Sequence, residues 1–186
     1  MTVKAGQDIR RKLRASLEKF LKGAEHIALL AVGSSLRGDD AAGLLIAEKL
    51  AATAEIRKLH SKFRVFVGET APENLTGEIR KFNPDRILIV DAADAGKQPG
   101  EVMLLNPEEI GGLSFSTHKL PLKLMVLYLQ ESISCAVTII GIQPGNLTFG
   151  KPLSKAVRVS AGGVAQDIAK AALHVFSPGR TSKARK

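Results

Sequence analysis

The stretch His26-Ile-Ala-Leu-Leu-Ala-Val-Gly-Ser-Ser-Leu-Arg-Gly-Asp-Asp-Ala-Ala-Gly-Leu-Leu-Ile-Ala-Glu-Lys-Leu50 decides the fold. Residues 27–32 are an unbroken apolar run of strand length, which is typical of a strand covered on both faces in a parallel sheet. From Leu44 onward the apolar residues recur at helical spacing, so a strand, a glycine-containing turn and a helix follow one another. Asp39 and Asp40 stand where the turn meets the helix. The sequence therefore predicts two carboxylates at the carboxyl end of a central strand, where open α/β sheets bind their ligands.

These two aspartates distinguish the turn from a phosphate-binding loop. Gly33 and Gly38 have the spacing of a P-loop, but a P-loop continues with a lysine and a hydroxyl residue where this chain has Asp39 and Asp40. Two negative charges repel a polyphosphate and attract a cation, so the turn favours metal binding over nucleotide binding. A simpler interpretation stays open, in which Asp39 caps the helix and Asp40 complements the helix dipole.

The rest of the chain continues the alternation of strands and helices. Apolar patterns predict strands at 63–67, 86–90, 101–105 and 135–142, and helices at 75–82, 122–129 and 157–175. The Gly162-Gly163 pair weakens the prediction of the last helix, since a glycine inside a helix costs about 1 kcal/mol relative to alanine. This alternation predicts an α/β fold with a parallel sheet, in a chain long enough for one domain with its own core.

The two ends of the chain differ from its body. Residues 1–25 contain an amphipathic helix, which we expect to pack on its own domain, although such a helix can also lie on a membrane surface. We assign residues 26–176 to the core of a single domain spanning 1–186, and residues 177–186 to a basic, disordered tail.

The formal net charge of +9 lies at the ends. Residues 1–23 hold seven basic and two acidic side chains, residues 178–186 hold four basic side chains, and the remainder is neutral. A neutral body argues against a broad nucleic-acid-binding face, although RNA binding by the ends stays an alternative. No apolar segment reaches the roughly 18–20 residues needed to span a bilayer and no secretory leader opens the chain, so we expect a cytoplasmic protein. The single cysteine, Cys135, lies in an apolar run and is expected to be a core residue.

Two further residues extend the candidate site. Asp91 follows the predicted strand 86–90, and His118 lies on a glycine- and serine-rich loop just before a predicted helix. The carboxyl ends of parallel strands meet at one edge of a sheet, so Asp40, Asp91 and His118 are expected to converge there as exposed side chains. Two carboxylates and one imidazole suit a divalent first-row metal, with water or substrate in the remaining positions.

Five motifs occur in order along the chain: Gly33-Ser-Ser-Leu-Arg-Gly-Asp-Asp-Ala-Ala-Gly43, Glu69-Thr-Ala-Pro-Glu-Asn74, Leu88-Ile-Val-Asp-Ala-Ala-Asp94, Ser116-Thr-His-Lys-Leu-Pro121 and Gly141-Ile-Gln-Pro144. Together they resemble the maturation endopeptidases of nickel-iron hydrogenases, especially the branch that processes the large subunit of formate-hydrogenlyase-type hydrogenase. The resemblance covers roughly residues 27–173.

The resemblance implies a three-layer α/β/α sandwich around a twisted, mostly parallel sheet of the phosphorylase/hydrolase-like type. It implies an endopeptidase that removes the C-terminal extension of the nickel-loaded hydrogenase large-subunit precursor. Its metal-contacting positions match Asp40, Asp91 and His118, and the nickel belongs to the substrate, so the enzyme need hold no metal between turnovers.

Several chemical alternatives stay open. An unligated carboxylate such as Asp39 is a candidate general base, although the identity of the base is not decided by the sequence. No Gly-x-Ser-x-Gly motif is present, which disfavours a serine nucleophile. The main alternative function is a non-catalytic chaperone that senses or delivers nickel during hydrogenase assembly. The oligomeric state is left undetermined.

Overall fold

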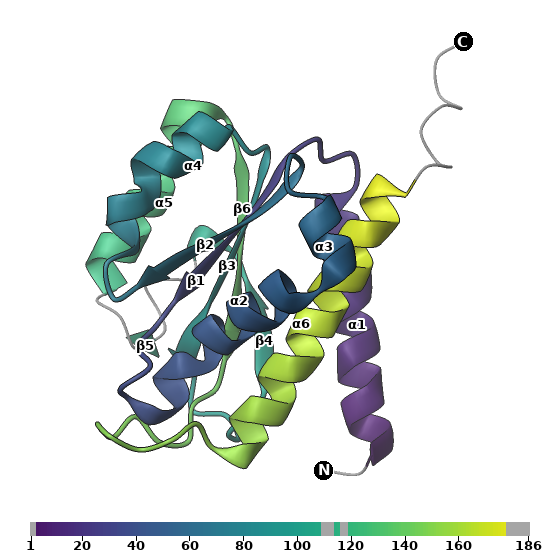
Figure 1. The fold of residues 1–186 in the computed structure, drawn as a ribbon. Helices are drawn as coiled ribbons and strands as arrows, with labels where there is room; N and C mark the ends of the chain where they lie inside the picture. The colour runs from purple at the N-terminus through teal and green to yellow at the C-terminus, as the bar shows by residue number, and fades with distance from the viewer. Residues whose placement is uncertain (1–2, 109–113, 116–118, 178–186) are drawn as a thin grey trace.

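A computed structural model describes residues 3–108, 114–115 and 119–177 and has one central sheet between layers of helices (Figure 1). The strands are β1 (Ile27–Val32), β2 (Phe63–Glu69), β3 (Arg86–Asp94), β4 (Val102–Leu105), β5 (Ser114–Phe115) and β6 (Ala136–Ile142). Their order is β2-β1-β3-β6-β4, with β5 paired to β3 outside this path. Strands β2, β1, β3 and β6 are parallel to one another. Strand β4 runs antiparallel to β6, and β5 runs antiparallel to β3. The predicted mostly parallel sheet is confirmed.

The helices cover both faces of the sheet. They are α1 (Val3–Leu21), α2 (Ala42–Ala52), α3 (Ala54–Lys58), α4 (Thr76–Phe82), α5 (Lys119–Ile133) and α6 (Lys155–Phe176), with short 3₁₀ turns η1 (Gly38–Ala41) and η2 (Pro72–Leu75). Helices α2 and α6 pack on one face, and α4 and α5 on the other (Figure 1). The result is the predicted three-layer α/β/α sandwich, with α1 lying against α6 on the outside.

Alternation along β1 explains why this strand is central. Ile27, Leu29 and Ala31 belong to the core under α2 and α6, whereas Ala28, Leu30 and Val32 belong to the core under α4 and α5. All six residues are buried. Because successive side chains of a strand point to opposite faces, a strand covered on both sides must be apolar throughout.

The structure corrects the predicted end of one strand and confirms the predicted last helix. Strand β3 does not end before Asp91 but continues to Asp94, since its far end is paired with β6 and β5. Helix α6 runs without interruption through Gly162-Gly163. The tail from residue 178 onward lies outside the described residues. Within the described part of the chain, no helix has the length and apolar character that crossing a membrane requires.

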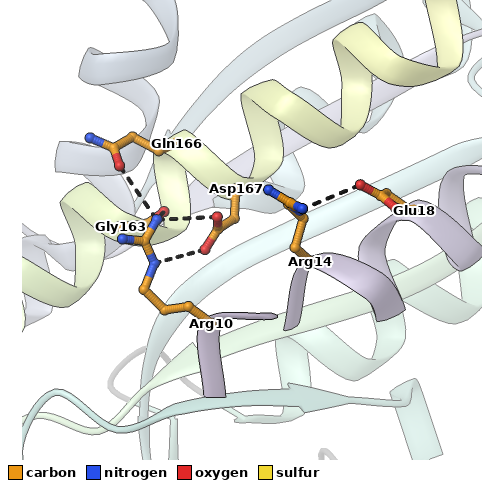
Figure 2. Close-up of polar contacts among 6 residues, drawn as sticks. All are labelled: Arg10, Arg14, Glu18, Gly163, Gln166 and Asp167. Atoms are coloured by element: carbon orange, nitrogen blue, oxygen red, sulfur yellow. Dashed lines mark hydrogen bonds and ion pairs between the residues drawn. The ribbon is translucent and has the colours of Figure 1, made fainter. Parts of the chain in front are cut away.

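An ion pair whose carboxylate is buried joins α1 to α6 (Figure 2). The guanidinium of Arg10 donates to both carboxylate oxygens of Asp167, at 3.0 and 3.1 Å, and to the carbonyl oxygen of Gly163 at 3.0 Å. A Cβ at Gly163 would lie 3.1 Å from Arg10 Nε, so the glycine leaves room for the guanidinium. Apolar residues of α1 complete the interface with buried side chains: Leu13, Leu17 and Leu21. The amphipathic helix thus packs on its own domain. Its apolar residues Leu13, Leu17 and Leu21 are buried there, so they are not exposed to a membrane surface.

Replacing Arg10 should destabilise the fold more than replacing its neighbour Arg14. The side chain of Asp167 is only 6% exposed, so Arg10→Gln leaves a buried carboxylate without its guanidinium and should cost about 1–3 kcal/mol. The Arg14–Glu18 pair is 3.5 Å apart with side chains 45% and 36% exposed, so Arg14→Gln should change stability by less than about 0.5 kcal/mol. Urea unfolding of both variants measures the difference, and equal losses would contradict this account.

Candidate active site

The link between β1 and α2 depends on a glycine in the left-handed region. Gly33 has φ +133°, and a Cβ built there would overlap the backbone carbonyl oxygen of Asp40. Its N–H donates to the carbonyl oxygen of Glu69 at 2.9 Å, which continues the pairing of β1 with β2. Only a residue without a side chain allows the chain to pass so close to Asp40. The end of β1 therefore lies directly against the peptide that carries this aspartate.

Asp39 holds the segment that joins β6 to α6. Its Oδ2 accepts hydrogen bonds from the N–H groups of Gly145 and Asn146, at 2.7 and 3.0 Å, and its Oδ1 accepts from Ser154 N–H at 2.7 Å. The residue is fully buried. The N-cap residue of α2 is Ala41 and α2 has no side-chain cap hydrogen bond, so the interpretation of Asp39 as a simple helix cap is wrong. Because both carboxylate oxygens already accept backbone hydrogen bonds, Asp39 is poorly suited to accept a proton from water.

Asp40 and Asp91 are buried, each only 1% exposed, which corrects the expectation of exposed carboxylates at the sheet edge. Asp40 is buried because η1 packs against β3, and Asp91 is buried because it lies within β3, paired with β6. Burial strengthens the electrostatic attraction between a carboxylate and a cation, because the local dielectric is lower than that of water.

Gly43 brings the elements that carry these two aspartates together. A Cβ on Gly43 would overlap the carbonyl oxygens of Val32 at the end of β1 and Val90 in β3. Asp40 lies three residues before this contact along the chain, and Asp91 directly follows Val90. The first turn of α2 therefore packs against the backbone of the two central strands, beside both carboxylates.

Asp91 lies within β3, in register with Gly141 of β6. By alternation it shares a face with Ile89 and Ala93, which belong to the core under α4 and α5. Its Oδ1 accepts a hydrogen bond from Ala92 N–H at 2.7 Å. Asp91 is therefore directed to the side of the sheet that α5 covers.

His118 lies outside the described residues, so the structure does not test the predicted convergence of all three side chains. Within residues 3–108, 114–115 and 119–177, no three His, Cys, Asp or Glu side chains form a group that could hold a metal ion. The candidate metal site thus consists of Asp40 and Asp91 in the described part of the chain.

Gln143 is a buried residue whose role the sequence reasoning did not identify. Its Oε1 accepts hydrogen bonds from Ala95 N–H at 2.8 Å and Lys97 N–H at 3.1 Å, and its Nε2 donates to Asp94 at 2.9 Å. Hydrogen bonds from Gln143 and from Gly96 N–H lower the pKa of the Asp94 carboxyl below its ordinary value of 3.8. The available signal was a polar residue directly after the apolar strand β6. Gln143 joins the loop after β3 to the end of β6, next to the segment held by Asp39.

Cys135 does not offer an alternative nucleophile. It is buried, and burial raises the pKa of its thiol above the ordinary value of 9.0. A raised thiol pKa disfavours the thiolate, which is the reactive form.

Comparison with known proteins identifies the family. The sequence profile described as hydrogenase maturation protease matches residues 44–171. The chain is 40% identical over 131 residues to the hydrogenase 3 maturation protease of Escherichia coli K12, covering 70% of this chain and 80% of that protein. The chain belongs to the hydrogenase maturation protease family.

Solved structures agree with this assignment. The HycI maturation protease of Thermococcus kodakarensis has a TM-score of 0.74 and 31% identity, covering 84% of this chain and 97% of that one. The endopeptidase HycI of Escherichia coli has a TM-score of 0.69 and 37% identity, covering 78% of this chain and 90% of that one. The predicted fold and family are confirmed, and the family membership makes the chain a peptidase. Helix α1 precedes the region that the family profile matches.

Gly43→Ala should destabilise the protein because the added methyl group overlaps two backbone oxygens that cannot move independently of the sheet. We expect a loss of about 1–3 kcal/mol in the free energy of unfolding. Gly77→Ala in α4 is the matched control, since a Cβ there meets nothing within 4 Å and alanine is the better helix former. This control should gain about 0.5–1 kcal/mol. Denaturant unfolding measures both, and a stable Gly43→Ala protein would contradict the proposed close contact.

Asp39→Asn should loosen the segment between β6 and α6. An amide places an N–H donor where the carboxylate accepts, so we expect a loss of about 1.5–3 kcal/mol, the range for hydrogen bonds to charged groups. Amide hydrogen exchange at Asn146 and Ser154 should accelerate in the variant. Asp94→Asn changes an exposed aspartate and should leave exchange at these two amides unaltered. Unchanged exchange in Asp39→Asn would show that the carboxylate does not restrain this segment.

Proposed function

We propose that this peptidase removes the C-terminal extension of a nickel-loaded hydrogenase large-subunit precursor, and that Asp40, Asp91 and His118 contact the nickel of that substrate. The observation that carries the proposal is the pair of buried carboxylates on two elements, η1 and β3, that the chain brings together where Gly43 packs against Val90. Two carboxylates held in a low-dielectric setting favour a cation, and a divalent metal in the client supplies one.

Chain connectivity supports His118 as the third ligand. Phe115 pairs with Ala93 at the end of β3, two residues after Asp91, and three residues of chain span at most about 10 Å. Lys119 begins α5, which covers the face of the sheet that Asp91 shares. Helix α5 leads back into parallel strand β6, so its first turn lies toward the carboxyl ends of the strands. The described residues before and after His118 in the chain therefore lie on the side of the sheet where Asp91 is found, which supports the proposal that His118 is the third ligand.

The proposed chemistry is metal-assisted hydrolysis of one amide bond. A water oxygen adds to the scissile carbonyl carbon, the carbon–nitrogen bond breaks, and the water's proton is transferred to the leaving nitrogen. The nickel of the substrate would orient the peptide and polarise the carbonyl or the water. The Asp39 carboxylate is engaged by three backbone N–H groups, so we assign it a positioning role instead of the role of general base.

Mass spectrometry of the client tests this function. Wild-type protein incubated with nickel-loaded precursor should shorten it at the C-terminus, whereas precursor without nickel should keep its mass. A nickel-delivery chaperone would leave both masses unchanged, and that result would overturn the proposal.

Asp40→Asn and Asp91→Asn should each reduce processing by about a hundredfold or more, because metal contacts contribute several kcal/mol to stabilisation of the transition state. The amide oxygen can still accept the Ala92 N–H bond in Asp91→Asn, so the fold should persist. Asp94→Asn, an exposed aspartate on the same strand, is the matched control and should process the precursor normally. His118→Ala should weaken turnover and affinity for the nickel-loaded client together. Normal cleavage by Asp40→Asn or Asp91→Asn would remove that residue from the mechanism, and a defect in only one of the two His118 readouts would contradict its role as a ligand.

A further inference from the structure

Two large apolar side chains project from neighbouring loops at the carboxyl end of the sheet. Leu36, between β1 and η1, is 58% exposed, and Phe149, between β6 and α6, is 72% exposed. Phe149 is the most exposed large apolar side chain among the described residues. Exposed aromatic and aliphatic groups next to one another on ordered loops are typical of binding surfaces.

Backbone hydrogen bonds join these loops to each other. The carbonyl oxygen of Leu36 accepts from Gly150 N–H at 2.8 Å, next to Phe149 in the chain. Gly38 N–H donates to the carbonyl oxygen of Lys151 at 3.0 Å. Both loops lie together at the end of the sheet where α2 begins (Figure 1). Their apolar side chains are therefore presented by a fixed backbone.

Asp39 adds a second restraint to this arrangement. Its N–H donates to the carbonyl oxygen of Asn146 at 2.8 Å, and its carboxylate accepts from the N–H groups of Gly145, Asn146 and Ser154. A surface that is ordered before binding loses less conformational entropy when a partner docks.

The charged side chains that these two loops themselves contribute are basic. Arg37 and Lys151 are exposed beside Leu36 and Phe149, and neither segment 33–38 nor segment 141–158 contains an acidic residue. The nearest acids along the chain, Asp39 and Asp40, are buried. The surface is thus apolar with a basic rim, which complements a segment that carries apolar and acidic side chains.

We propose that Leu36 and Phe149, with Arg37 and Lys151 at the rim, form the docking surface for an apolar and acidic segment of the hydrogenase precursor. Leu36 lies four residues before Asp40, so a client bound here is next to the proposed nickel-contacting carboxylate. The inference rests on the proposed function for the identity of the client. It goes further by naming the surface that recognises protein rather than metal.

The double variant Leu36→Ser/Phe149→Ser tests the surface with both processing and binding. Steady-state processing of nickel-loaded precursor should show KM raised at least about tenfold, as expected from the loss of two buried apolar contacts, with kcat within about twofold of wild type. Binding of nickel-free precursor, measured by biolayer interferometry, should weaken by a similar factor. The matched control is Leu124→Ser/Leu127→Ser on α5, whose side chains are 56% and 46% exposed, and it should leave KM and binding unchanged.

A charge variant tests the basic rim separately. Arg37→Glu/Lys151→Glu should raise KM at low salt, and added salt should then strengthen precursor binding, since salt screens the repulsion between like charges as it screens the attraction in the wild type. Circular dichroism and thermal unfolding of every variant confirm that the exposed substitutions leave the fold intact.

The outcomes separate this inference from the proposed function. Normal KM and normal binding in Leu36→Ser/Phe149→Ser, with cleavage retained, overturn the docking surface and leave the peptidase standing. If the wild type binds the precursor without cutting it and the double variant does not bind, the docking surface is supported and the proposed cleavage is overturned. Absence of precursor binding by wild type overturns the surface. A dimer of the wild type that the double variant dissociates, with precursor binding unchanged, assigns the pair to self-association and also overturns it.

Discussion

The carboxylate of Asp39 accepts hydrogen bonds from three backbone N–H groups on the segment between β6 and α6. The arrangement of the loops at the carboxyl end of the sheet depends on this contact. One of these groups belongs to Ser154, the N-cap residue of α6. The same aspartate directly precedes Asp40 in the chain. A single buried charge thus links the turn after β1 to the start of the last helix. Hydrogen bonds to a buried carboxylate are stronger than those between neutral groups, which explains how one side chain can order two loops.

Close backbone contacts complete the arrangement begun by Asp39. Gly33 lets β1 pass against the peptide of Asp40, and Gly43 lets α2 pack on the carbonyl groups of Val32 and Val90. The aspartates are buried because helix and strands approach more closely than any side chain at these glycines would allow. The burial of these two aspartates therefore depends on positions that contribute no functional group.

The N-terminal helix is attached to the outside of the sandwich by an ion pair and an apolar interface. Helix α1 precedes the region matched by the family profile, and the Arg10–Asp167 pair attaches it to α6. The loops that carry Leu36 and Phe149 are joined to each other by backbone hydrogen bonds at the carboxyl end of the sheet. Helix α1 packs on the outside of α6, away from the central strands (Figure 1).

The sequence by itself determined the central strands, the alternation of strands and helices, and the placement of Asp40 and Asp91 near one edge. These features are local, because residue periodicity and glycine-containing turns act over a few neighbouring positions. The convergence with His118 stays a prediction. Only the tertiary structure decided that Asp39 restrains a distant loop, that Asp40 and Asp91 are buried, and that Gln143 joins two strand ends. Asp39 and Ser154 are 115 positions apart in the chain, so no local pattern reveals their hydrogen bond. Burial of a carboxylate likewise depends on what folds over it, which is a property of packing and not of the residues beside it in sequence.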